Sequence, residues 1–477
     1  MPTARLRIRQ WPDHRTVWRW HFYAGVLCIP FVLWLAATGS VYLFKPQIDA
    51  WLDRPCDNLT VDGPPASASA QVGAALAAVP GAVLNAYELP GTAHSAARVL
   101  LGRGERLTRV YVHPVTLQVL RVVDEDSRFS NLIFHLHGEL MQGDRGSMVV
   151  ETAASWTIVM LITGLYLWWP KDSRGIAGVL YPRLSRRGRL FWRDTHTVTG
   201  FWVSFFALFL LISGLPWARS WGGMLESLRH WSSAVPIKQD WTTGASSELA
   251  ERRLANAAPD TAHRSAEHAA HQRNTGPDAP EGAPQLLEHD PDYRQLDGLV
   301  PVVRAESLKP PVLIAPPSRR EPGWTARSET QNRPQRAELT LDGARALVVS
   351  RRDFSQRPWL DRVIGIAIAA HEGQLFAPLN QALGLFTAAS LWLVSISAIV
   401  MWWRRRPARV LGAPEPAARP ALAIGMLAIV IFLSVLLPLM GATLLAVLAL
   451  ERIVLRRWPA AREFLGLPAA AARSTPV

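Results

Sequence analysis

Four histidines in this sequence stand at matched distances from nearby glycines and tryptophans, and histidine commonly binds metals or transfers protons. His137 in FHLHGELM and His371 in HEGQLF each precede a tryptophan pair by the same interval. His21 and His196 each precede two glycines, and both intervals to the glycines are also equal. These equal spacings indicate an internal repeat in which histidines occupy equivalent positions.

The glycines belong to the same pattern as the histidines. The shorter interval is about one helical turn and the longer one is about five turns, which places each histidine and its two glycines on one stripe of a helix. The two stripes consist of His21, Gly25 and Gly39, and of His196, Gly200 and Gly214. A flat ligand or a neighbouring helix can approach closely along such a stripe.

Long uncharged stretches decide the class of protein. Of the 477 residues, 49% are hydrophobic and 20 are tryptophan. About 20 apolar residues span a bilayer as a helix. Five stretches that lack Asp, Glu, Lys and Arg qualify: Phe22–Phe44, Thr152–Trp169, Thr197–Ala218, Ala382–Trp403 and Ala421–Leu450. The chain is therefore expected to be an integral membrane protein in contact with the lipid bilayer.

The net charge of +13 reflects the predicted membrane orientation. The bases cluster in alternate short loops, and such loops stay in the cytoplasm. They are Arg5, Arg7, Arg9, Arg15 and Arg19; Lys171, Arg174, Arg183, Arg186, Arg187, Arg189 and Arg193; and Arg404, Arg405 and Arg406. We therefore expect the N-terminus in the cytoplasm and the two large loops on the outer side of the membrane. Nucleic acid is not an expected partner.

The two cysteines and the first apolar stretch exclude two further features. Cys28 lies in the first predicted span and Cys56 lies beyond it, so no disulfide is expected. The first stretch could be a cleaved signal peptide, but the uncharged run Phe22–Phe44 is long for the apolar region of a signal sequence. We expect a retained membrane anchor.

The polar regions between the spans contain strand patterns. SASAQVGAALAAV predicts a short helix, and AVLNAYEL, ARVLLG, LTRVYVHP and TLQVLRVV predict strands of a small α+β domain. In the second region, a polar tract at about 241–297 predicts a disordered insertion, and GWTARSET, AELTLD and ALVVSRR predict strands. Each half thus consists of a span, an outer domain and a second span, which predicts two parallel repeats.

The expected fold class is a membrane all-α bundle of four core transmembrane helices, with small α+β periplasmic domains and a C-terminal hydrophobic helix or hairpin. Residues 421–450 could form one long kinked helix, or a hairpin that returns Arg452, Arg456 and Arg457 to the cytoplasm. The expected segments are 1–45 (N-terminus and first span), 46–134 (first outer domain), 135–170 (histidine motif and second span), 171–195 (basic loop), 196–218 (third span), 219–370 (second outer region), 371–403 (histidine motif and fourth span), 404–420 (linker), 421–450 (last span or hairpin) and 451–477 (tail).

This topology sorts the four histidines by membrane face. His21 and His196 begin spans at the cytoplasmic face, whereas His137 and His371 precede spans at the outer face. Two imidazoles that face each other across a bundle can hold a haem iron from both axial sides. The sequence therefore predicts haem ligation at His21, His137, His196 and His371, with His135 as the alternative to His137.

Simpler interpretations remain open for several residues. His21 alone could belong to an interfacial aromatic belt. Arg19 and Arg193 could pair with haem propionates, although setting orientation is their default role. The remaining histidines are expected in loops or at the surface (His14, His94, His113) or in a solvated linker (His263, His268, His271). Arginines of the second outer region would suit an anionic chelate, but a solvated face is preferred; examples are Arg319, Arg320, Arg327, Arg333 and Arg336.

Several motifs resemble the PepSY-associated transmembrane family, whose members are also called iron-regulated membrane proteins. They are HRTVWRWHFYAG, FHLHGELM, WRDTHTVTGFW and RPWLDRVIGIAIAAHEGQLFAPLNQALG, and LTRVYVHPVTLQVLRV is similar to a PepSY domain core. The resemblance covers residues from about 14 to 406, apart from the tract at 241–297. It implies haem-binding reductases of the bacterial inner membrane that reduce ferric siderophores on the periplasmic side.

We therefore expect a reductase with two haem b groups that passes electrons from an unidentified donor, a quinol or a reductase, to a periplasmic ferric chelate. The iron ligands would be the four histidines above, and no catalytic residue is identified. The alternative is a non-redox PepSY membrane protein that binds or regulates a periplasmic peptidase or assists a transporter. A transporter of iron chelates is disfavoured because the spans lack the charges expected around a polar solute.

Overall fold

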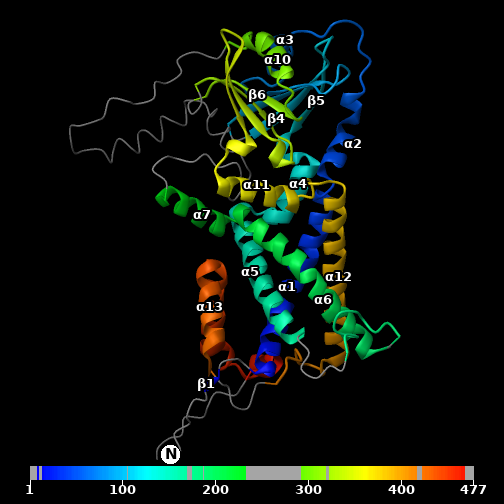
Figure 1. Cartoon of the computed structure of the whole chain (residues 1–477), viewed down its shortest axis with the longest axis vertical. Coiled ribbons are helices and arrows are strands. Elements are labelled where there is room, and N and C mark those ends of the chain that lie inside the picture. Colours follow the sequence, from blue (N-terminus) through cyan, green and yellow to red (C-terminus); the bar gives the residue numbers. More distant parts are fainter. Residues whose placement is uncertain are drawn as a thin grey trace, which may run out of the picture.

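The computed structural model describes residues 8–9, 13–104, 106–168, 175–185, 187–232, 292–318, 322–415 and 422–467. A bundle of long helices carries a sheet domain at one end, which we call the sheet end (Figure 1). The N-terminal strand lies at the opposite end, which we call the terminal end. Most of the predicted insertion at 241–297 and His263, His268 and His271 lie outside the described residues.

The two halves of the chain follow the same order of elements. The first half contains α1 (His14–Tyr42), α2 (Lys45–Asp57), α3 (Ala68–Ala78), β2 (Val83–Glu88), β3 (Ala97–Arg103), β4 (Arg106–Val112), β5 (Val119–Asp124), η1 (Glu125–Ser127), α4 (Phe129–Glu139) and α5 (Gly143–Trp168). The second half contains α6 (Arg189–Gly214), η2 (Leu215–Trp217), α7 (Arg219–Ser232), α10 (Gln295–Ala305), β6 (Val312–Ala315), β7 (Trp324–Ser328), η3 (Arg333–Gln335), β8 (Ala337–Asp342), β9 (Leu347–Asp353), η4 (Phe354–Gln356), α11 (Trp359–His371) and α12 (Leu379–Arg405). The structure thus has the repeat that the histidine spacings indicate.

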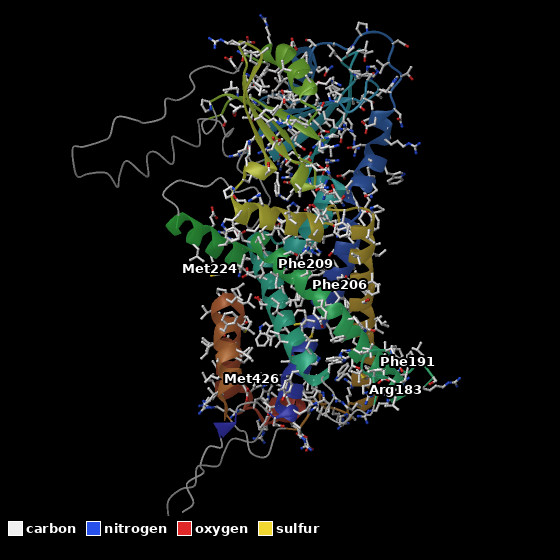
Figure 2. The ribbon with its side chains drawn as sticks, in the orientation of Figure 1. Arg183, Phe191, Phe206, Phe209, Met224 and Met426 are labelled. Carbon is white, nitrogen blue, oxygen red and sulfur yellow. The ribbon has the colours of Figure 1, made fainter. Side chains whose placement is uncertain are left out.

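Helices α1, α5, α6 and α12 form a four-helix bundle in which α1 packs on α5 and α12, and α6 packs on the same two helices. All four are long and apolar enough to cross a membrane and coincide with the first four predicted spans. Figure 2 shows Phe206 and Phe209 in the C-terminal half of α6, and both are more than one-third exposed. Exposed apolar side chains of this kind suit contact with lipid.

The strands of both halves form one antiparallel sheet in the order β5-β4-β3-β2-β6-β7-β8-β9. The halves join where β2 pairs with β6, through Tyr87 opposite Ile314 and Glu88 opposite Leu313. The expectation of separate outer domains therefore gives way to a single sheet, because pairing at the central strands removes an exposed edge from each half. Helices α3 and α10 supply Val72 and other apolar side chains to the main core of this sheet.

The two histidine motifs lie on short helices rather than at the start of the second and fourth spans. Helices α4 and α11 lie across the sheet end of the bundle, and each ends at a sharp turn before a long helix (Figure 1). At the first turn Leu140 and Gly143 have positive φ angles. Gly146 packs so closely that a Cβ atom there would lie 1.6 Å from the Glu139 carbonyl oxygen. The chain direction therefore changes between each histidine and the span that follows it.

The last apolar stretch forms a hairpin of α13 (Ile424–Leu436) and α14 (Pro438–Leu450), followed by η5 (Glu451–Leu455) and α15 (Pro459–Leu465). The hairpin starts at the terminal end, where β10 (Leu422–Ala423) pairs with β1 (Ile8–Arg9), and it returns there, because the Tyr23 hydroxyl donates to the Leu465 carbonyl. Pro438 occupies the first turn of α14, where a missing N–H costs nothing. Of the two alternatives left open by the sequence, the structure has the hairpin.

A buried ion-pair cluster connects the sheet to the helices below it. Arg109 donates to Glu125 from Nε at 2.7 Å, and it also donates to Glu88. Burial alone would raise the pKa of Glu125, but the charge and hydrogen bonds of Arg109 and Arg128 lower it to about 2 from its ordinary value of 4.5. The Glu125 carboxylate therefore stabilises the fold above about pH 4.5, and this contribution is lost as the pH falls toward 2.

We expect Glu125→Gln to destabilise the sheet domain by about 3 kcal/mol, because it removes one partner of a buried arginine. The variant should also lose part of the acid sensitivity of the wild type between about pH 4.5 and 2. Thermal unfolding followed by tryptophan fluorescence would measure both, since Trp324 lies in the sheet core. The control Arg345→Gln removes an exposed ion pair and should leave the melting temperature unchanged. Equal melting temperatures for both variants would contradict this role of the cluster.

Candidate functional site

The first histidine pair lies near the terminal end of the bundle, on two helices that face each other diagonally. His21 of α1 and His196 of α6 have ring centroids 6.3 Å apart and ring planes 76° apart. Both helices pack on α5 and α12, which complete the bundle around the pair. The two histidines that the sequence assigns to one membrane face therefore come together inside the bundle.

Hydrogen bonds determine which ring nitrogen of these two histidines carries the proton. His21 Nδ1 lies 3.1 Å from the Met160 carbonyl oxygen, and His196 Nδ1 lies 3.0 Å from the Val394 carbonyl oxygen. A carbonyl can only accept, so Nδ1 is the donor in each ring. The lone pair of each neutral imidazole is therefore on Nε2, which is a common metal-ligating nitrogen.

The second pair lies at the sheet end and is held by hydroxyl groups. His137 Nδ1 lies 2.9 Å from Thr38 Oγ1, and His371 Nδ1 lies 2.8 Å from Ser213 Oγ. Both hydroxyls donate their own proton to a carbonyl one turn earlier in their helix, so each accepts from the imidazole N–H. Burial lowers the pKa of His137 to about 4 and that of His371 to about 3, so both rings are neutral at pH 7.

All four histidines therefore share one arrangement, in which Nδ1 is hydrogen-bonded to the protein and Nε2 is available to bind a ligand. None of the four Nε2 atoms has a hydrogen-bond partner among the described residues. A histidine that binds a metal usually donates its other ring nitrogen to a carbonyl or a similar group, which orients the ring. The donor set thus fits two sites of two neutral imidazoles each.

Glycines allow the close approach of three of these rings. A Cβ atom on Gly39 would lie 3.1 Å from His137 Cε1, one on Gly164 would lie 3.1 Å from His21 Cε1, and one on Gly214 would lie 3.5 Å from His371 Cε1. Gly200, in contrast, has no heavy atom within 4 Å of such a Cβ. In the two predicted stripes, only Gly39 and Gly214 contact a histidine. Each of them contacts a histidine of the sheet-end pair, His137 or His371, and not the histidine of its own stripe.

Sequence reasoning missed the groups that orient the rings. Thr38, Ser213 and Thr163 each precede one of the contacting glycines, and Ser397 Oγ lies 3.4 Å from His196 Nδ1. The sequence does contain a signal for Thr38, Ser213 and Thr163. Each is a hydroxyl residue followed directly by glycine, a dipeptide that recurs in three of the spans.

His135 has a different environment from His137. Its Nδ1 lies 2.9 Å from Glu139 Oε2, and the residue lines a pocket at the sheet end. Two residues apart on α4, the two rings therefore face different surroundings, and it is His137 that lies against α1. His94 and His113 bond to loop carbonyls of the outer region, in agreement with the loop positions predicted for them.

The predicted propionate partners have protein partners of their own. Arg19 donates to the Gly466 carbonyl at 3.2 Å and to the Pro414 carbonyl. Arg193 pairs with the buried carboxylate of Asp194 at 2.8 Å. The contacts of Arg19 attach the C-terminal segment to the terminal end of the bundle, and Arg183, which also pairs with Asp194, attaches the basic loop.

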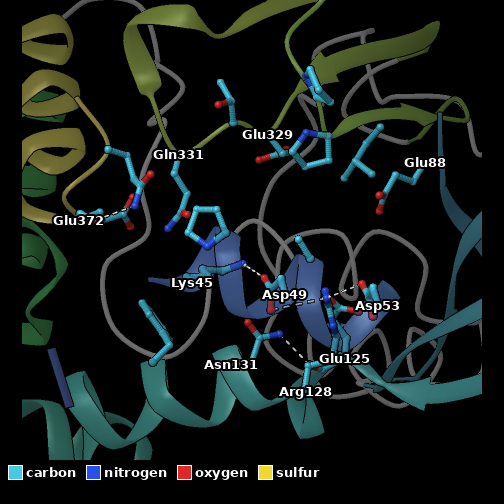
Figure 3. A pocket seen from close by; sticks show the side chains of 18 of the residues that line it. Lys45, Asp49, Asp53, Glu88, Glu125, Arg128, Asn131, Glu329, Gln331 and Glu372 are labelled. Atoms are coloured by element: carbon cyan, nitrogen blue, oxygen red, sulfur yellow. Dashed lines mark hydrogen bonds and ion pairs between the residues drawn. The ribbon is translucent and has the colours of Figure 1, made fainter. Parts of the chain in front are cut away.

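A pocket of about 650 Å³ lies outward of the second histidine pair, between the sheet and helices α2 and α4 (Figure 3). Ion pairs line it, including Lys45 with Asp49, and Arg327 with Glu329 at 2.6 Å. Glu372, next to His371, faces the pocket, and burial raises its pKa although Arg333 opposes the shift. The sequence gives no sign of this pocket, because its walls come from both halves of the chain.

The pocket revises the interpretation of the second-region arginines. Arg327, Arg333 and Arg336 line the pocket and are at most one-sixth exposed, so they do not form the solvated face preferred from the sequence. Arg319 and Arg320 lie outside the described residues.

Fold and site together define a membrane protein whose helical bundle holds two histidine pairs and carries one sheet domain. The profile of the PepSY-associated TM region matches residues 18–405, and the chain belongs to this family. The matched region includes all four histidines and the whole sheet. A search of curated proteins found no match.

We expect Gly39→Ala to lower the melting temperature relative to Gly200→Ala. Alanine improves helix propensity equally at both positions, but only at Gly39 must the new methyl group displace an imidazole. A cost of about 1 kcal/mol corresponds to about 2–4 °C in melting temperature. Thermal melts of the two variants in detergent would measure the difference, and equal melting temperatures would show that His137 does not pack against α1 as described.

Proposed function

We propose that this protein is a haem-containing reductase of the bacterial inner membrane that passes electrons to a periplasmic ferric complex, such as a ferric siderophore, in iron acquisition. The observation that carries this proposal is the arrangement of four half-buried histidines as two pairs with unused Nε2 atoms. Haem supplies one-electron redox chemistry when its iron is bound by such nitrogens.

The separation within the first pair supports bis-histidine ligation. A metal about 2 Å from each nitrogen sets two ring centroids about 6 Å apart, because each nitrogen lies about 1 Å from its own ring centre. The observed separation of His21 and His196 is 6.3 Å. In this assignment, His21 and His196 would hold one haem b and His137 and His371 would hold the other.

The protein residues would orient the ligands and exclude water. Thr38 and Ser213 hold the Nδ1–H groups at the sheet end, and the Met160 and Val394 carbonyls hold them at the terminal end. These bonds favour one tautomer and keep the ring basic toward a metal.

Two sites also fit the thickness of a membrane. His21 and Gly39, which contacts His137, are about five helical turns apart on α1, or about 27 Å along the helix. The hydrocarbon core is about 30 Å thick, so the two pairs would lie near opposite faces. Arg404 and Arg405 end α12 and Arg406 follows it at the terminal end, which supports placing that end in the cytoplasm and the sheet in the periplasm. The donor, a quinol or a reductase, would then act at the terminal end.

The test is to purify the wild type, His196→Ala and His371→Ala from cells supplied with haem. Each variant should retain about one haem per chain instead of two, because each removes one axial ligand of a single site. After reduction with dithionite, the wild type should be reoxidised by a ferric chelate, and His371→Ala should lose most of this reaction.

The control is His94→Ala, which changes a histidine bound to a loop carbonyl in the outer region. It should keep the spectrum and haem content of the wild type. Well-folded wild-type protein without haem would contradict the reductase and favour a PepSY protein that acts through its outer pocket alone.

A further inference from the structure

Two aromatic side chains lie between the sheet-end histidine pair and the outer pocket. Tyr42 is the last residue of α1, four residues beyond Thr38, and Trp217 lies four residues beyond Ser213 at the end of η2. Four residues are about one helical turn, so each aromatic lies one turn outward of a hydroxyl that holds a histidine. Both Tyr42 and Trp217 line the pocket.

Ring contacts connect this pair of aromatics to the histidine motifs. The Trp217 ring centroid lies 5.7 Å from that of His371, with the planes 80° apart. The Tyr42 ring lies 6.0 Å from Phe134, which belongs to the other histidine motif and also lines the pocket. Trp217 therefore contacts a proposed iron ligand on one side and the pocket on the other.

The two aromatics occupy equivalent positions of the internal repeat. The interval from Tyr42 to Trp217 in the sequence equals the interval from Thr38 to Ser213. The pocket walls otherwise differ between the halves: α2 and α4 line one side, and η3 with its preceding loop lines the other. An aromatic ring outward of each hydroxyl is thus a shared feature of an otherwise asymmetric pocket.

We propose that the pocket binds the ferric chelate and that Tyr42 and Trp217 form its floor, through which electrons pass from the sheet-end histidine pair to the chelate. This inference rests on the proposed function. In the step, one electron leaves the reduced carrier at His137 and His371, which is oxidised by one unit, and the ferric ion of the chelate becomes ferrous. No covalent bond to the protein forms or breaks.

The physical role of the floor is to separate the polar pocket from the histidine pair while keeping the distance between them short. The pocket is polar and lined by ion pairs, whereas the rings of the histidine pair are bonded to the hydroxyls of Thr38 and Ser213 between the helices. A single aromatic side chain, Trp217, is enough to exclude water from the histidine pair. The ferric chelate in the pocket is then separated from the proposed ligand His371 by the Trp217 ring alone. A smaller aliphatic side chain at Trp217 would admit water or lengthen the gap.

The pocket lining also specifies the chemistry of the ligand. Its acids and bases are largely engaged with each other, as in Lys45 with Asp49 and Arg98 with Asp57. Amide side chains such as Asn131 and Gln374 lie among them. Paired charges and amides suit an oxygen-rich polar chelate of low net charge, and a neutral trihydroxamate complex is therefore the appropriate probe.

The experiment compares Trp217→Leu, Trp217→Phe and Tyr42→Leu with the matched control Trp359→Leu. Trp359 lies on α11 with His371, but it is 69% exposed and does not line the pocket. Dithionite-reduced protein is mixed with the ferric trihydroxamate, and reoxidation is followed by absorbance. Haem content, midpoint potential and binding of the redox-inert gallium(III) trihydroxamate are measured for every variant, the last also on protein prepared without haem.

At a saturating concentration of the ferric chelate, we expect Trp217→Leu to slow reoxidation about tenfold and Tyr42→Leu to slow it by a smaller factor, with haem content unchanged. Binding of the gallium complex shows the concentration at which the pocket of each variant is saturated. Trp217→Phe should recover most of the rate, and Trp359→Leu should match the wild type. Excess gallium complex should slow reoxidation of the wild type by occupying the pocket.

Two results would overturn this inference. If Trp217→Leu is reoxidised as fast as the control, electrons do not pass through the aromatic floor. If the gallium complex does not slow reoxidation, the pocket is not the site of the ferric chelate. Absence of haem would instead contradict the proposed function, and gallium-complex binding to that protein would still show whether the pocket takes a chelate.

Discussion

The structure of the bundle depends on the hydrogen bonds that satisfy four histidine rings within a membrane protein. A polar group that is buried away from water must find a partner, and here each Nδ1–H finds one on a neighbouring helix. His21 bonds to a carbonyl of α5, and His196 bonds to one of α12. Each bond therefore joins two helices of the bundle and determines which nitrogen of the ring remains unused.

The same requirement explains the small residues along the helices. A ring can reach its hydroxyl or carbonyl only where the facing backbone is accessible, and Gly39 and Gly164 leave space for His137 and His21. The short helices α4 and α11 have a related purpose. These helices lie across the end of the bundle (Figure 1), so that His137 reaches Thr38 of α1 and His371 reaches Ser213 of α6 from the side.

The sequence predicted the four spans and most strands, because each follows from periodicity within one half of the chain, and the equal spacings of the repeat also indicated that His21 and His196 come together. It could not predict the β2–β6 junction, since Tyr87 and Ile314 belong to different halves and neither strand pattern specifies its neighbour. The hairpin at Pro438 also remained open, because a proline after an apolar run fits a kink as well as a turn.

The pocket was hidden for a related reason. Charges that look solvated in the sequence, such as Arg327 with its partner Glu329, line a pocket whose opposite wall is α2 of the first half. The ring partners Thr163 and Ser397 likewise lie far along the chain from His21 and His196, the histidines they contact. Contacts of this kind depend on packing between helices, which a single sequence does not specify.

The central claim is that the four histidines bind two haem irons, each between two imidazoles. The most direct measurement is electron paramagnetic resonance of the oxidised, purified wild type, combined with chemical determination of haem per chain. The account predicts about two haems per chain and two low-spin ferric signals of bis-imidazole type. A folded protein without haem, or one with high-spin haem lacking a second histidine ligand, would contradict it.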